Sequence, residues 1–131
     1  MKAALFILSL MLLTSVTSCH SDDDSNTNNG LNGQWNLTHV SGGLVGVDKS
    51  FEPGLIVWTF NERTGMVTIV NNSDDGFSML ESGNYTFSII DEGNYNSITI
   101  GEMTLGSIAI SQNQIMIDQR VADGFLLELS K

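Results

Sequence analysis

Between residues 31 and 131, apolar side chains recur at every second position within short segments. Ile56, Trp58 and Phe60 alternate in one segment, and Tyr85 and Phe87 in another. A period of two places alternate side chains on one face of a β-strand, whereas a helix needs a period of 3.6. We therefore expect little or no helix and eight strands, at residues 34–40, 55–61, 66–71, 83–90, 97–101, 107–111, 114–118 and 125–130.

The connections between these segments favour hairpins. Residues 61–65, 112–113 and 122–124 are short and rich in Asn, Asp and Gly, which suit tight turns. Hairpins that join neighbouring strands produce an antiparallel up-and-down sheet, and eight strands suffice to close it into a barrel without exposed edges. An all-β, eight-stranded barrel is the predicted fold, with an open β-sandwich of the same strands as the alternative.

The first predicted strand opens with Gly33-Gln34-Trp35, which resembles the G-x-W motif of lipocalins. The wider pattern resembles the small lipocalin-like domain of Bacteroidota lipoproteins, in the stretches LNGQWNLTHVSGG, GLIVWTFNERTGMVTI, SGNYTFSI and GSIAISQNQIMID. This resemblance implies a calycin-type barrel in which Gly33 and Trp35 plug the closed end. The basic residue that lipocalins carry near the last strand has two candidates here, Lys131 and Arg120, and the acidic-tyrosine motif of larger lipocalins has no counterpart.

An eight-stranded barrel either fills with side chains or holds one small ligand. The inward set is bulky: Trp35, Leu37, Ile56, Trp58, Phe60, Tyr85, Phe87, Ile98, Ile100, Ile108, Ile110, Ile115, Ile117, Leu127 and Leu129. We therefore expect either a filled barrel or a shallow mouth for a small apolar or amphipathic ligand. The candidate ligand-binding residues are His39, Leu44, Val45, Trp58, Phe60, Tyr85 and Phe87.

Two connections are candidates for function. Residues 38–53 are long for a loop between strands, and Leu44 and Val45 at its centre would either cap a ligand at the barrel mouth or tuck into the barrel end. Residues 72–80 place Phe77 and Leu80 among acidic residues, which suits a surface that binds a partner protein.

Catalytic chemistry has little support in the sequence. His39 shares the parity of Trp35 and Leu37, so we expect it to face inward near the open end. No second histidine or cysteine of the predicted barrel offers a metal partner, and no serine has an ordered His-acid pair. We predict a protein that is not an enzyme, with no catalytic residue, no metal ligand and no cofactor.

Residues 1–18 have the layout of a secretory signal: Lys2, a short apolar run and a small-residue end. Val16-Thr17-Ser18-Cys19 resembles a bacterial lipobox, which implies that Cys19 becomes the first residue and carries lipid, palmitate included. Several acyl chains anchor a protein stably, whereas a single chain does not. The alternative is a plain secretory signal that leaves Cys19 as a free thiol.

Residues 19–30 are predicted to form a lipidated, disordered tether, because they are polar and lack core-forming side chains. Ser21, Asp22, Asp23 and Asp24 resemble the acidic tag that directs Bacteroidota lipoproteins to the outer face of the outer membrane. A simple solvated spacer and a calcium site are the alternatives for this run. The predicted organisation is thus a signal peptide at 1–18, a tether at 19–30 and one barrel domain at 31–131.

The negative net charge of the chain excludes some classes of binding partner. The full chain has a formal net charge of −10. Removing the first 18 residues takes away Lys2 and leaves 15 acidic residues against 4 basic ones, so the net charge of the remainder is one unit more negative. Nucleic acids and anionic lipid surfaces call for basic patches, so neither is an expected partner of the domain.

The sequence is compatible with two functions. One is a monomeric, outer-membrane surface lipoprotein that binds a small hydrophobic ligand without chemistry. The other is a solid-cored structural or inhibitor-like module that contacts an envelope protein.

Overall fold

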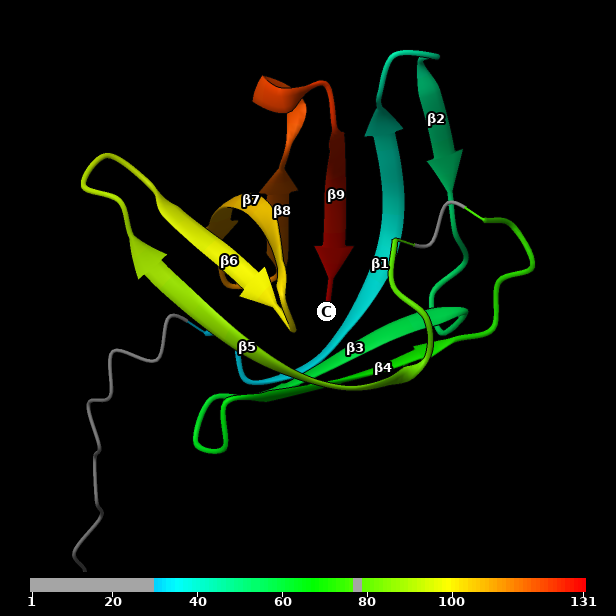
Figure 1. The fold of residues 1–131 in the computed structure, drawn as a ribbon. Coiled ribbons are helices and arrows are strands. Elements are labelled where there is room, and N and C mark those ends of the chain that lie inside the picture. Colours follow the sequence, from blue (N-terminus) through cyan, green and yellow to red (C-terminus); the bar gives the residue numbers. More distant parts are fainter. Residues whose placement is uncertain (1–29, 77–78) are drawn as a thin grey trace, which may run out of the picture.

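The computed structural model describes residues 30–76 and 79–131 (Figure 1). Several predicted features lie outside the described residues and stay predictions: the signal segment, Phe77, the lipidation site Cys19, and the export residues Ser21, Asp22, Asp23 and Asp24.

The regular secondary structure of the described chain is almost entirely β-strand. They are β1 (Gly33–Gly42), β2 (Val47–Ser50), β3 (Ile56–Asn61), β4 (Met66–Asn71), β5 (Gly83–Asp91), β6 (Asn96–Ile100), β7 (Met103–Ile110), β8 (Gln114–Asp118) and β9 (Phe125–Ser130). The one helical element in this part of the chain is a short 3-10 turn, η1 (Arg120–Ala122). None of the described helices is long and apolar enough to cross a membrane.

The sheet closes on itself. Its strand order is β2-β1-β3-β4-β5-β6-β7-β8-β9, and β1 also pairs with β9. All neighbouring strands are antiparallel, so β1 and β3 to β9 form a closed up-and-down barrel of eight strands. The predicted all-β barrel is confirmed, and the open sandwich is wrong. Each predicted strand matches an observed one, with the largest difference at β7, which begins at Met103 instead of 107.

β2 is an additional strand within residues 38–53, where the sequence predicted a loop. It pairs with the second half of β1, from His39 to Gly42, while β3 pairs with the first half, from Gly33 to Asn36. β2 has the sequence Val-Asp-Lys-Ser, in which Val47 is the single β-branched residue and no apolar side chains alternate. The loop prediction is wrong here because pairing with β1, and not local sequence, stabilises this segment.

Bulky side chains fill the barrel interior. The largest fully buried ones are Trp35, Trp58, Leu31, Leu37, Ile56, Ile69, Ile98, Ile100, Leu105, Ile115, Ile117 and Leu127. Tyr85, Phe87 and Ile110, predicted to face inward, are partly buried and pack against this core. Val67 and Ile69 of β4 also belong to the core, although the predicted inward set omits them.

Trp35 is fully buried near the start of β1. Its indole Nε1 donates to the Leu31 carbonyl at 2.7 Å, and the Lys131 ammonium lies 4.6 Å from the ring centroid, within cation–π range. Gly33, two residues earlier, has a φ of +108°, which a residue with a side chain rarely adopts. The chain therefore enters β1 through a glycine-dependent turn, and Lys131, not Arg120, is the basic residue beside the tryptophan.

Replacing Trp35 by Ala should lower the free energy of unfolding by about 3–5 kcal/mol, because the side chain is fully buried and the cavity would not collapse completely. Urea unfolding measures the loss. Val121→Ala is the control, since Val121 is fully exposed and its truncation should cost less than about 0.5 kcal/mol. A loss below about 1 kcal/mol for Trp35→Ala would show that Trp35 is not the predicted barrel plug.

Candidate functional site

Three of the predicted ligand-contacting aromatic residues meet inside the barrel. The ring centroids of Trp58 and Phe60 lie 6.2 Å apart, and those of Phe60 and Phe87 lie 5.1 Å apart in an edge-to-face arrangement. Trp58 is completely buried and Phe60 nearly so. Tyr85 is partly buried, and its hydroxyl donates to the Glu81 carbonyl at 2.9 Å. These aromatic rings are packed as core.

Trp58 carries an unusual polar atom within this core. Its indole Nε1 is buried and has no hydrogen-bond partner among the described residues, whereas that of Trp35 is bonded to Leu31. An unsatisfied buried donor costs about 1–3 kcal/mol. An ordered internal water is the usual partner for such a group.

His39 lies on the outer wall of the barrel, so the expectation that it faces inward is wrong. Leu37 pairs with Leu129 but His39 pairs with Glu128, which leaves Thr38 as the extra residue of a β-bulge. A bulge reverses the alternation of the residues that follow it. Val40, not His39, therefore takes the buried inward position.

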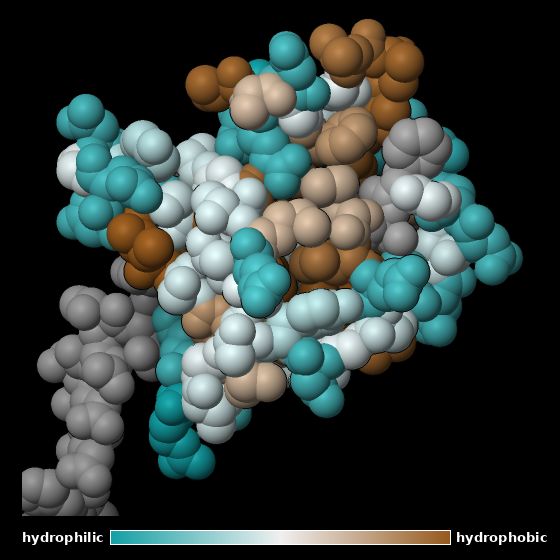
Figure 2. All heavy atoms as spheres, in the orientation of Figure 1, coloured by the Kyte–Doolittle hydropathy of each residue, from teal (hydrophilic) through white to brown (hydrophobic). Residues whose placement is uncertain are grey.

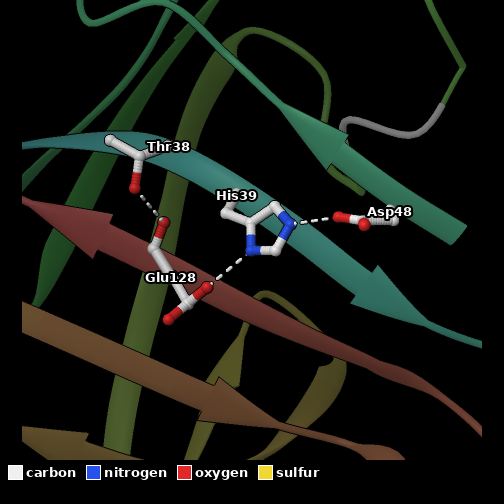
Figure 3. A network of polar contacts seen from close by, with 4 residues as sticks. All are labelled: Thr38, His39, Asp48 and Glu128. Carbon is white, nitrogen blue, oxygen red and sulfur yellow. Dashed lines mark hydrogen bonds and ion pairs between the residues drawn. The ribbon is translucent and has the colours of Figure 1, made fainter.

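The bulge places His39 between two carboxylates from different strands (Figure 3). Its Nδ1 lies 2.6 Å from Glu128 Oε2 on β9, and its Nε2 lies 2.6 Å from Asp48 Oδ1 on β2. Carboxylates only accept hydrogen bonds, so both ring nitrogens must donate, which is the imidazolium form. The hydrogen bonds that His39 donates to Asp48 and then to Glu128 raise its pKa above the ordinary value of 6.5.

Leu44 and Val45 project into solvent at the turn between β1 and β2, with 88% and 85% of their surface exposed. They do not tuck into the barrel end, so that alternative is wrong, and their role in capping a ligand stays a prediction. Figure 2 shows hydrophobic side chains exposed over this turn, at the upper end of the molecule. The turn projects because pairing with β2 extends β1 into a hairpin.

A groove of about 660 Å³ lies on the outer wall, where β6, β7 and β8 run side by side. It is larger than two other grooves of the described surface, of about 400 and 260 Å³. The turn between β5 and β6 borders one side of the groove and η1 the other. Its lining residues are Glu92, Tyr95, Ser97, Thr104, Leu105, Gly106, Ser107, Asp118, Gln119, Val121, Ala122 and Gly124.

The floor of the groove is a row of polar residues. Ser97 pairs with Ser107, and Ser107 pairs with Asp118. Each is next to an inward-facing isoleucine, so all three face outward. Ser97 is nevertheless 95% covered, and its hydroxyl donates to Glu92 Oε1 at 3.0 Å.

Asp118 is paired with Arg120 at the edge of the groove. Arg120 Nε lies 3.0 Å from Asp118 Oδ1, and Nη2 lies 2.7 Å from Oδ2. The side-chain hydrogen bonds from Arg120, supported by its backbone N–H, lower the pKa of Asp118. Both carboxylate oxygens of Asp118 are therefore engaged.

Sequence reasoning missed the groove because it depends on a second bulge. Ile98 pairs with Gly106 but Thr99 pairs with Thr104, so Leu105 is an extra residue in β7. Gly106 has a φ of +119°, and a Cβ there would lie 2.4 Å from the Asp118 carbonyl oxygen. A glycine inside a strand pattern is the signal that would have indicated this bulge.

No cluster of three or more His, Cys, Asp or Glu side chains is arranged to hold a metal ion in the described ranges. Asp48 and Glu128 contact opposite nitrogens of the His39 ring, so this trio cannot share one ion. Comparison of the chain with protein-family models, curated proteins and solved structures gives no match in any of the three.

The His39 contacts predict a pH-dependent stability. Because the folded-state pKa is raised, the stabilisation is complete below about pH 6.5, the unfolded value, and is lost as the pH rises through the folded value. The difference in unfolding free energy between wild type and His39→Gln should therefore be larger at pH 6 than at pH 9. Urea unfolding at both pH values measures it, and groups common to both proteins cancel.

Glu128→Gln provides the control for this experiment, because removing one carboxylate should shrink the pH-dependent part of the His39 contribution. Equal differences at the two pH values in the wild-type background would mean that the contacts of His39 do not depend on its protonation.

Proposed function

We propose that this protein is a lipid-anchored, non-enzymatic binding module of the outer membrane, and that its ligand site is the outer-wall groove. The observation that carries the proposal is the contrast between a filled interior and a groove of about 660 Å³ outside it. Ligand sites commonly have volumes of about 300–1,000 Å³ and combine apolar walls with a few placed polar groups. The groove has both, whereas the predicted site at the barrel mouth is occupied by core side chains.

The location rests on the sequence before the barrel. The resemblance of residues 16–19 to a lipobox supports lipidation of Cys19, and the acidic run after it supports export to the cell surface. Lys131, which follows β9 and contacts Trp35, supports the resemblance to lipocalins, in which a basic residue is expected near the end of the last strand.

The binding role, as opposed to catalysis, is supported by His39. A general base or a metal ligand needs a free ring nitrogen, and both nitrogens of His39 are engaged by carboxylates. The side chain of His39, on β1, thus connects β2 and β9 by hydrogen bonds and leaves no ring nitrogen free.

A second candidate function is protein docking through the turn between β1 and β2. Leu44 and Val45 favour it, since two adjacent and almost fully exposed apolar side chains are unusual on a soluble surface. This role agrees with the alternative of an interaction module, and it is compatible with ligand binding in the groove.

Cys19→Ala should release the protein from membranes into the soluble fraction, because the acyl chains would supply the anchor. Membrane fractionation followed by immunoblotting measures this, and Ser25→Ala in the same segment is the control. Persistent attachment of the Cys19→Ala protein to membranes would contradict lipidation as the anchor.

Thr104→Trp should remove ligand binding, because the larger side chain would fill the groove from an exposed strand position. The protein is purified from its own membrane, and native mass spectrometry shows whether a non-covalent adduct is present. Thr68→Trp is the matched control: Thr68 is also exposed on a strand and hydrogen-bonded to a neighbouring strand, but does not line the groove.

The adduct should be present in wild type and Thr68→Trp and absent in Thr104→Trp. A bare wild-type mass, or an adduct that survives in Thr104→Trp, would contradict the assignment of the groove as the ligand site.

A further inference from the structure

The two sides of the groove present an aromatic ring and an aliphatic side chain to a ligand. Tyr95, in the turn between β5 and β6, is 56% exposed, and Val121, in η1, is fully exposed. Both line the groove and come from its two borders. The face of an aromatic ring carries a partial negative charge, which attracts the partially positive C–H groups of a sugar ring.

The floor offers hydrogen-bond acceptors at regular intervals. Ser97, Ser107 and Asp118 occupy paired positions on three adjacent strands, which are about 4.8 Å apart. The hydroxyl of Ser97 donates to Glu92 and that of Ser107 donates to the Asp118 carbonyl, so both hydroxyl oxygens keep lone pairs. These oxygens, together with Glu92 and the amide of Gln119, suit a ligand with many hydroxyl donors.

The charge of the lining argues against an anionic ligand. Among the described residues that line the groove, two are acidic and none is basic. Arg120 stands at the edge, but its guanidinium is held by both oxygens of Asp118. A phosphate, a fatty-acid carboxylate or an acidic sugar would therefore meet the carboxylate of Glu92 without a compensating cation.

We infer that the groove binds a short neutral oligosaccharide, with a sugar ring stacked on Tyr95 and its hydroxyls bonded to the polar floor. This inference rests on the proposed function, because it names the ligand class of the same groove. A sugar has apolar faces and polar edges, and it matches a groove whose walls are apolar and whose floor is polar.

The test uses the lipidated protein in nanodiscs and surface plasmon resonance. The probes are maltohexaose, cellohexaose, xylohexaose and mannohexaose, with hexagalacturonate as an anionic sugar of similar size. At least one neutral hexasaccharide should bind, and hexagalacturonate should bind at least about tenfold more weakly than it. Glu92→Gln should narrow this gap, since it removes the repelling charge and keeps an acceptor.

Variants of Tyr95 separate stacking from a structural role. Tyr95→Ala should weaken binding of the neutral hexasaccharide at least about tenfold, whereas Tyr95→Phe keeps the ring and should stay within about threefold. Thr104→Trp should abolish binding and Thr68→Trp should leave it unchanged. Thermal unfolding of each variant checks that the barrel is intact.

Two outcomes overturn the inference: no neutral hexasaccharide binds, or binding persists in Tyr95→Ala. The adduct seen by native mass spectrometry distinguishes a failure of this inference from a failure of the proposed function. If sugars fail but an adduct is present and is lost in Thr104→Trp, the groove binds another class of ligand. If the adduct is still present in the Thr104→Trp protein, the groove is not the binding site and both proposals fail.

Discussion

Pairing of β1 with β9 is the contact on which the rest of the structure depends. It closes eight strands into a ring, and a ring of this size has an interior that its own side chains can fill. The tryptophans illustrate the result, since Trp35 and Trp58 face one another across the β1–β3 pair and both are fully buried. Closure thus stabilises the fold and fills the interior, so the groove lies on the outer wall of the barrel.

Two bulges shape that outer wall. The bulge at Thr38 turns His39 outward, where it connects β9 with β2 and so fixes the additional strand to the barrel. The bulge at Leu105 shifts the register of β7 against β6 beside the groove. The next residue, Gly106, permits the close approach of β8 because it has no side chain. Bulges commonly re-aim side chains at functional positions, and here each one accompanies a feature that a regular barrel would lack.

The sequence was sufficient for the fold because alternation of apolar residues is a local signal. All eight strands of the barrel were predictable in this way. β2 was not, since its four residues carry no apolar alternation and form a strand only through pairing with β1.

The site was less predictable for a related reason. Assigning His39 to the interior assumed that alternation continues unchanged along β1, and one extra residue reverses it. The groove combines residues from β6, β7, β8 and two turns, and no single segment contains its pattern. The aromatic residues Trp58 and Phe60 were correctly expected to face inward, but burial in a packed core is what their alternation alone indicates.

A crystal structure of the mature protein, purified from its membrane with whatever it carries, would show whether a ligand lies in the groove or inside the barrel. Ligand density is expected on the outer wall between Tyr95 and Val121, with no more than an ordered water at Trp58 Nε1 inside the barrel. Continuous ligand density inside the barrel, beside Trp58 and Phe87, would instead place the binding site in the interior and rule out the groove.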